Sequence, residues 1–88
     1  MNNERLSQIR AEIDAIDTEL AALFERRMGV MSEVAAIKQA AGLPIYDPAR
    51  EEVVIAQGRA RVVPEYADAM EQLLRELMRL SKEYQQRQ

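Results

Sequence analysis

Cysteine, histidine and tryptophan are absent from this 88-residue sequence, and glycine and proline occur only three times each. Without cysteine there is no disulfide framework, no thiolate nucleophile and no cysteine-based metal site. Without histidine the chain lacks the commonest general base and the commonest zinc ligand. Few glycines and prolines, with aliphatic rather than aromatic apolar residues, favour helices over a turn-rich β fold. We therefore predict an all-α protein.

Blocks of charge and long apolar runs are also missing. Basic and acidic residues are interleaved, and the formal net charge is −3, which makes the chain a poor candidate for binding duplex nucleic acid. No apolar run approaches the roughly 20 residues of a membrane span, and the charged N-terminus is unlike a signal peptide. We expect a cytoplasmic protein that binds neither nucleic acid nor membrane, with one domain over residues 1–88.

Apolar residues recur at alternating intervals of three and four from Leu6 onward, which is the heptad pattern of a long helix. Arg27 is the one polar member of this pattern. Gly42 followed by Pro44 supplies an end, so we predict a helix over Glu4–Ala41. The pattern, called the seam below, consists of Leu6, Ile9, Ile13, Ile16, Leu20, Leu23, Arg27, Val30, Val34, Ile37 and Ala41.

The length of this helix has a consequence for assembly. About 38 residues rise roughly 57 Å, whereas a compact chain of this size has a radius of gyration of only about 12 Å. One chain cannot cover both ends of the seam, and large exposed apolar patches are rare. The seam therefore predicts an intertwined homodimer with three helices per chain.

Two shorter helices follow. Asp47 is placed to cap a second helix that begins at Pro48 and runs to about Arg59,. Pro64 opens a third helix that runs to about Gln86,. Its predicted inward face consists of Ala67, Met70, Leu74, Leu77, Ser81 and Tyr84, with Met78 and Gln85 adjoining.

Polar residues interrupt the apolar faces in two places. Arg27 and Lys38 are eleven residues apart, so on a helix they differ by only about 20° in direction and about 16 Å in height. Two such cations can hold the ends of a small dianion, or each can reach solvent or pair with an acidic residue. Ser81 and Gln85 share a face of the third helix. Alternatively, the serine bonds its own backbone and the glutamine is solvated.

The start of the second helix and Arg10 are further candidates. Arg50 and Glu51 follow Asp47 and either pair with their neighbours or stand at the mouth of the same pocket. Arg10 precedes Arg27 by 17 residues, about 25 Å along a helix, so the two cannot meet around one small ligand within one chain. In an antiparallel dimer, Arg10 of one chain and Arg27 of the other can meet around one ligand. Taken alone, however, Arg10 is interpreted as a surface residue.

These residues, in this order and on these helices, resemble the all-α class of chorismate mutase, and the resemblance covers essentially the whole chain. The matching stretches are Ile9-Arg10 with Ile13-Asp14 and Ile16-Asp17, then Arg26-Arg27, Val34 to Lys38, Gly42 to Glu51, and Ser81 to Gln85.

The resemblance implies conversion of chorismate to prephenate in aromatic amino-acid biosynthesis, the shikimate route. It also implies a homodimer with two active sites, each taking one arginine from the partner chain, and no metal or cofactor. By the resemblance, Arg10 of the partner and Arg27 hold the substrate carboxylates, Lys38 and Gln85 donate to the ether oxygen, and Glu51 accepts from the ring hydroxyl. The remaining substrate-binding residues it implies are Asp47, Arg50 and Ser81.

The residue inventory agrees with that chemistry. An intramolecular rearrangement needs no nucleophile and no proton transfer, so a chain without cysteine or histidine can catalyse it. It can do so by clamping a reactive conformer and by placing donors where charge grows. An amide donor such as Gln85 needs no protonation, which predicts a broad pH optimum through neutrality.

Two alternatives remain open. Isochorismate–pyruvate lyase is similar to this fold and also holds a dianion with cations. Asp47, Arg50 and Glu51 follow the mutase pattern, which favours the mutase over the lyase. A non-catalytic helical pairing module would explain the seam but not the isolated Arg27 within it. Since the chain ends soon after Gln85, we expect a monofunctional enzyme without an effector-binding domain.

Overall fold

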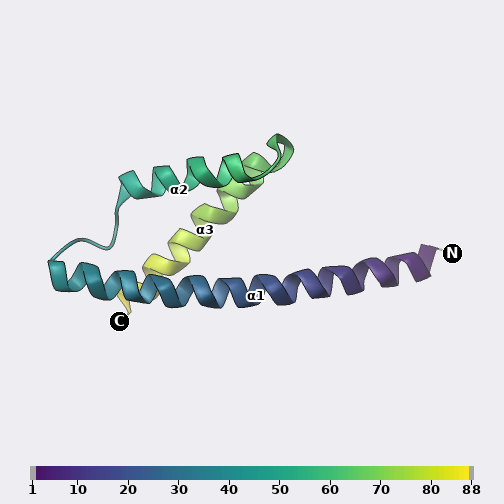
Figure 1. The fold of residues 1–88 in the computed structure, drawn as a ribbon, viewed down its shortest axis with the longest axis horizontal. Coiled ribbons are helices and arrows are strands. Elements are labelled where there is room, and N and C mark those ends of the chain that lie inside the picture. Colours follow the sequence, from purple (N-terminus) through teal and green to yellow (C-terminus); the bar gives the residue numbers. More distant parts are fainter. Residues whose placement is uncertain (1, 88) are drawn as a thin grey trace. The chain divides into compact units, whose positions relative to one another are not determined.

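A computed structural model of the chain describes residues 2–87, and these residues form helices and short connections (Figure 1). The elements are α1 (Asn2–Ala41), α2 (Pro48–Arg61), the short 3₁₀ helix η1 (Pro64–Tyr66) and α3 (Ala67–Gln86). The predicted all-α class with three helices is confirmed. No helix within residues 2–87 combines the length and the apolar character needed to cross a membrane.

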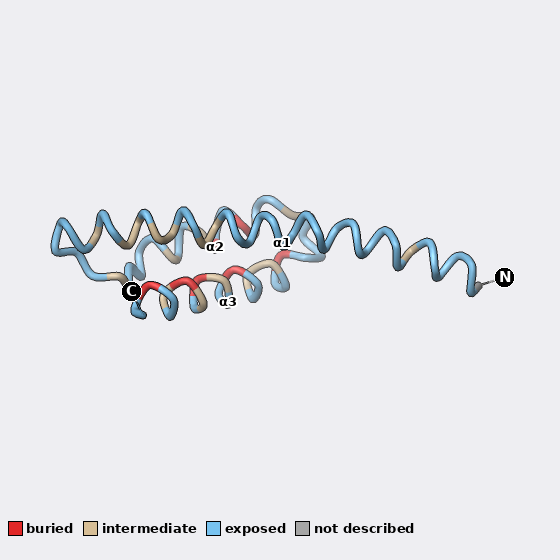
Figure 2. Tube along the Cα trace, turned by 90° about the horizontal axis from the view of Figure 1, so that it is seen from below, coloured by how far each residue is buried: buried red, intermediate tan, exposed pale blue. Residues whose placement is uncertain are grey.

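The chain divides into two compact units, Met1–Val30 and Met31–Gln88. The first contains the N-terminal part of α1, where most residues of the seam are exposed and Ile9 and Arg27 are half-buried (Figure 2). Ile16 is 62% exposed and Leu23 is 56% exposed. Most helical stability in proteins comes from packing of an apolar face, and this row of apolar residues is not packed within the unit.

In the second unit, α1 ends where the sequence predicts. Gly42 has a φ of +70°, a left-handed conformation that glycine adopts without a Cβ clash. The Gly42 N–H donates to the carbonyl of Gln39 at 3.2 Å, and the Leu43 N–H donates to that of Lys38 at 2.8 Å. This pair of bonds is a Schellman motif. It turns the chain directly after Lys38, a candidate site residue.

The start of α2 also follows the prediction. The carboxylate of Asp47 accepts a hydrogen bond from the Arg50 N–H at 3.1 Å, and Pro48 occupies the first helical position, where its missing N–H is not needed. The cap therefore fixes Arg50 and Glu51 in the first turn of α2.

Helices α2 and α3 pack against each other and form the core of the second unit. Ile55 from α2 and Leu74 and Met78 from α3 are buried. Gly58 lets the helices approach closely, since a Cβ there would overlap the side chain of Leu74. Val54, Met70 and Leu77 are half-buried around this core.

Two details of the third helix were predicted wrongly. Pro64 opens η1 rather than the α-helix itself, which starts at Ala67. The buried face also differs, because Tyr84 is 42% exposed while Gln85 is only 5% exposed. The error is confined to Tyr84, because Gln85, four residues after Ser81 and predicted to adjoin this face, is buried with Ala67, Leu74, Met78 and Ser81.

An ion-pair network joins α2 to α3 at the end near η1. Arg59 lies 2.8 Å from Asp68 and 2.9 Å from Glu71, and Arg75 lies 2.8 Å from Glu71. The hydrogen bond from Arg75 lowers the pKa of Glu71, partly opposed by desolvation and aided by the bond from Arg59. The folded pKa is thus below the unfolded one. The resulting stabilisation is present above the unfolded pKa and is lost as pH falls through the folded value.

Candidate active site

The eight candidate residues fall in both units. Arg10, which is exposed, and Arg27, which is half-buried, belong to the first unit. The second unit holds the other six on the end of α1, the start of α2 and the end of α3: Lys38, Asp47, Arg50, Glu51, Ser81 and Gln85.

The ammonium group of Lys38 is held beside the turn that follows α1. Its Nζ donates to the backbone carbonyl of Ile45 at 3.0 Å, and the side chain is half-buried. An ammonium has three N–H donors, of which this carbonyl uses one. The geometry fixes the cation and leaves it donors for a ligand.

Ser81 and Gln85 lie one turn apart on the buried face of α3. Ser81 is 2% exposed, and its hydroxyl donates to the carbonyl of Leu77 at 2.8 Å, so the backbone contact considered from the sequence does form. Gln85 is buried rather than solvated, and its Nε2 has no hydrogen-bond partner among residues 2–87. A buried donor without a partner is unfavourable by about 1–3 kcal/mol. An acceptor on a ligand would remove that penalty.

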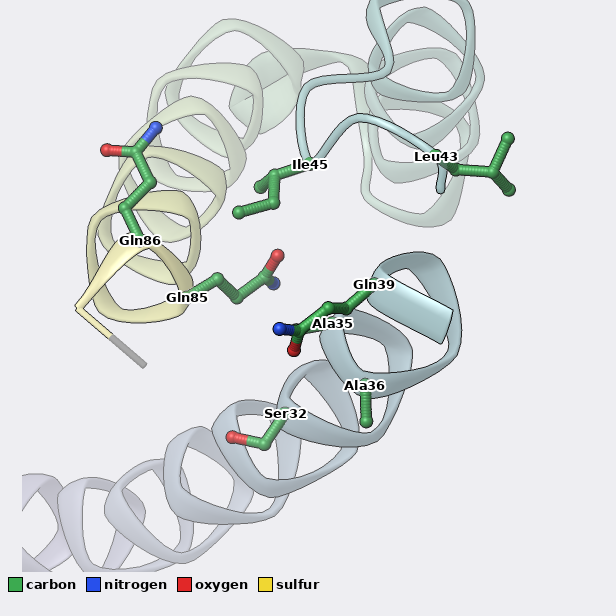
Figure 3. Close-up of a pocket in the computed structure, with 8 residues that line it drawn as sticks. All are labelled: Ser32, Ala35, Ala36, Gln39, Leu43, Ile45, Gln85 and Gln86. Carbon is green, nitrogen blue, oxygen red and sulfur yellow. The ribbon is translucent and has the colours of Figure 1, made fainter. Parts of the chain in front are cut away.

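Gln85 lines a cavity of about 450 Å³ between the end of α1 and the end of α3 (Figure 3). This volume lies within the range of small-molecule sites. The amide groups of Gln85 and Gln39 point toward one another in the space between the two helices. The other lining residues are Ser32, Ala35, Ala36, Leu43, Ile45 and Gln86.

Gln85 is the predicted site residue in the lining of this cavity, and the lining adds three polar residues that sequence reasoning missed: Ser32, Gln39 and Gln86. Ser32 and Gln39 are seven residues apart on α1, so the helical period places them on one face. That spacing was the available signal. Lys38 is linked to the cavity indirectly. Its Nζ donates to the backbone carbonyl of Ile45, and Ile45 lines the cavity.

Glu51 makes its contact elsewhere, across the junction of α2 and α3. Its Oε2 lies 2.7 Å from Nζ of Lys82, and Lys82 also stands 4.6 Å from the centre of the Tyr46 ring. Arg50, by contrast, is exposed. Sequence reasoning assigned no role to Lys82 or Tyr46, because a contact between residues 31 positions apart leaves no local pattern.

The arrangement offers hydrogen-bond donors and charges rather than a nucleophile. Lys38 and Gln85 both present N–H groups beside or near the cavity, and Glu51 presents a carboxylate. No group of three or more histidine, cysteine, aspartate or glutamate residues within residues 2–87 is placed to hold a metal ion. Such a set of groups is suited to binding an anionic, oxygen-rich molecule and stabilising charge on it.

Comparison with known proteins decides the family. Residues 9–86 match the family model described as chorismate mutase type II. The chain belongs to this family. All eight candidate residues fall within the matched range, and the family's all-α class agrees with the helices observed.

Relatives of the chorismate mutase type II domain extend the comparison. The chain is 41% identical over 80 residues to the T-protein of Haemophilus influenzae, an alignment covering 89% of this chain and 21% of that protein. It is also 41% identical over 51 residues to the chorismate mutase of Methanocaldococcus jannaschii, covering 58% of this chain and 52% of that one.

A third relative is the bifunctional chorismate mutase/prephenate dehydratase of Aquifex aeolicus, 42% identical over 48 residues, which is 54% of this chain and 13% of that protein. The chain thus spans about a fifth of the length of the T-proteins it matches. No solved structure matches this chorismate mutase type II chain significantly.

Proposed function

We propose that this chain catalyses the rearrangement of chorismate to prephenate in aromatic amino-acid biosynthesis, as one cytoplasmic domain over residues 1–88. Membership of the chorismate mutase type II family supports the reaction. The observation that carries the proposal is the amide nitrogen of Gln85. It is buried and has no partner among residues 2–87, and its residue lines a cavity of small-molecule size.

The reaction suits this set of residues. Chorismate is a dianion that rearranges within one molecule: the ether C–O bond breaks while a C–C bond forms, and no proton is transferred. The enzyme has two tasks, which are to hold the substrate in its compact reactive conformer and to stabilise negative charge that grows on the ether oxygen. Fixed cations and amide donors can perform both.

Lys38 and Gln85 donate to the ether oxygen in this proposal. Lys38 is held by the Ile45 carbonyl at 3.0 Å, so little reorganisation is needed before it meets the substrate. Gln85 gains an acceptor for its buried Nε2. Because the charge on the ether oxygen is larger in the transition state than in the ground state, these bonds lower the barrier rather than only strengthen binding.

Glu51 accepts a hydrogen bond from the ring hydroxyl, and three further residues complete the substrate-binding shell. Asp47 acts by capping α2 at 3.1 Å from the Arg50 N–H, which places Arg50 and Glu51. Ser81 lies one turn before Gln85 on the same buried face.

Arg27 and Arg10 of the partner chain hold the two substrate carboxylates. The exposed seam supports a homodimer, since pairing with a second copy would bury Leu6, Ile13 and their neighbours,. In an intertwined antiparallel dimer each of two active sites would receive one Arg10 from the other chain.

Offering chorismate and isochorismate separately to the purified protein tests this function. We expect chorismate absorbance to fall faster than the uncatalysed rate, with prephenate as the product. Salicylate formed from isochorismate, with chorismate untouched, would instead identify the lyase. Turnover of neither compound by a folded dimer would favour a pairing module and contradict the proposal.

A further inference from the structure

Lys82 is a half-buried residue of α3 to which the proposed chemistry assigns no role. It lies next to Ser81 and three residues before Gln85, and its Nζ is 2.7 Å from Oε2 of Glu51 on α2. The two side chains are 30% and 21% exposed, whereas Arg79 and Glu83 of an ordinary surface pair on the same helix are 56% and 51% exposed. The Lys82–Glu51 pair is therefore shielded more than a typical surface ion pair.

A second contact fixes the position of the ammonium. The ring of Tyr46, in the connection between α1 and α2, has its centre 4.6 Å from Nζ of Lys82, which is within the range of a cation–π interaction. Lys82 thus joins the connection before α2, the first turn of α2 and the end of α3. Its ammonium is held from two sides, by the Glu51 carboxylate and by the Tyr46 ring.

We propose that Lys82 is a positioning residue that orients Glu51 for the substrate and compensates its charge. The inference rests on the proposed function. By engaging Oε2, Lys82 fixes the carboxylate plane and leaves Oε1 to accept the hydrogen bond of the substrate hydroxyl. A carboxylate facing a dianionic substrate would otherwise repel it, because like charges brought close together without compensation oppose binding.

The proposal predicts a particular division between binding and turnover. The hydrogen bond of Glu51 to a ring hydroxyl is made in the ground state and in the transition state alike, so weakening it should raise KM with little change in kcat. Lys82→Met keeps the length of the side chain but removes the charge. We expect a KM increase of about tenfold with kcat changed less than about twofold. Lys82→Arg should return KM to within about threefold of the original value.

A double-mutant comparison separates action through Glu51 from direct action on the substrate. In the Glu51→Gln background, Lys82→Met should add less than about a twofold change in KM, because the group it orients is already altered. The same tenfold effect in both backgrounds would overturn the proposal, since Lys82 would then act on the substrate directly.

Arg79→Met is the matched control. Arg79 lines the same shallow cavity as Tyr46 and Lys82 and carries the same charge, but it pairs with Glu76 and Glu83 rather than with Glu51. We expect its KM to stay within about twofold of the original. An equal rise in KM for Arg79→Met and Lys82→Met would mean that overall charge attracts the substrate, and would also overturn the proposal.

The experiment distinguishes the failure of this inference from the failure of the proposed function. Each variant is first checked for helicity by circular dichroism, and Lys82→Gln replaces Lys82→Met if the latter is not folded. An original chain that does not convert chorismate contradicts the function itself. An active original chain in which the effects of Lys82→Met and Glu51→Gln simply multiply contradicts only the role of Lys82.

Discussion

The amide of Gln85 combines burial, a missing hydrogen-bond partner within residues 2–87 and a place in a cavity lining. A glutamine can donate at any pH, whereas the carboxylic acid of Gln85→Glu must be protonated to donate. The ordinary pKa of glutamate is about 4.3, and burial raises it. We expect Gln85→Glu to lose activity by about 100-fold at neutral pH and to regain it as pH falls. The original chain should stay nearly constant through neutrality.

The ratio of variant to original kcat/KM, measured at each pH, isolates this effect from the titration of the substrate. Gln85→Leu is the control, because it lacks a donor in any protonation state and should be equally weak at every pH. If the pH profile of Gln85→Glu runs parallel to that of the original chain, Gln85 does not act as a hydrogen-bond donor to the substrate.

Lys38 tests the contribution of a fixed charge. Its ammonium is already held by the carbonyl of Ile45 at 3.0 Å, so we expect Lys38→Ala to lower kcat by about 10³-fold or more. Circular dichroism should show unchanged helicity, because the side chain contributes little to the core. Near-normal turnover in Lys38→Ala would exclude Lys38 from the mechanism.

The sequence predicts which site residues share a helix face wherever the helical period alone decides it. The burial of Ser81 on the inward face follows from spacing alone; the shared face of Ser32 and Gln39 on α1 also follows from their spacing, although sequence reasoning missed it. The contact between Glu51 and Lys82 depends on how α2 crosses α3. No local pattern in the sequence encodes that crossing.

At the scale of elements, the close approach of α2 and α3 at Gly58 offers a stability test. Alanine raises intrinsic helix stability by up to about 1 kcal/mol over glycine. At Gly58, however, the added Cβ overlaps Leu74, and overpacking a core is unfavourable by about 1–3 kcal/mol. We expect Gly58→Ala to lower the free energy of unfolding, measured by urea denaturation at constant protein concentration.

Gly29→Ala is the matched control for this substitution. Gly29 also lies inside a helix, but apart from its chain neighbours and the nearby backbone of its own helix, no heavy atom of the described residues stands within 4 Å of the position its Cβ would take. We expect stabilisation by up to about 1 kcal/mol. If both variants gain equal stability, the helices do not approach as closely at Gly58 as described.

The ends of the elements were predicted best where capping chemistry is local. Asp47 and Gly42 each act within a few residues of their own position, so their roles can be derived from the sequence. The predicted start of α3 at Pro64 was wrong, because a proline at the first position is equally compatible with a 3₁₀ turn. The predicted burial of Tyr84 was wrong because tertiary packing, which no local pattern encodes, decides which of two adjacent helical rows is buried; at this end of α3 it is the row of Gln85, beside the end of α1.

At the scale of the whole molecule, the exposed seam and the exposed Arg10 lead to the same expectation. Leu6, Ile13, Ile16, Leu20 and Leu23 are 44–62% exposed, and burial of such a row against a second chain would stabilise it by roughly 25 cal/mol per Å². The same pairing would bring Arg10 of one chain to the site of the other. Assembly and catalysis are then one property of the molecule.

Mixing two inactive variants tests whether the site is shared. In a mixed dimer of Arg10→Ala and Lys38→Ala chains, one site lacks both residues, while the other takes Arg10 from the Lys38→Ala chain and Lys38 from the Arg10→Ala chain. We expect activity to return on co-refolding, approaching a quarter of the original specific activity when half of the dimers are mixed. Mixed dimers that form, as detected by a tag on one chain, but stay inactive would show that each chain builds its site alone.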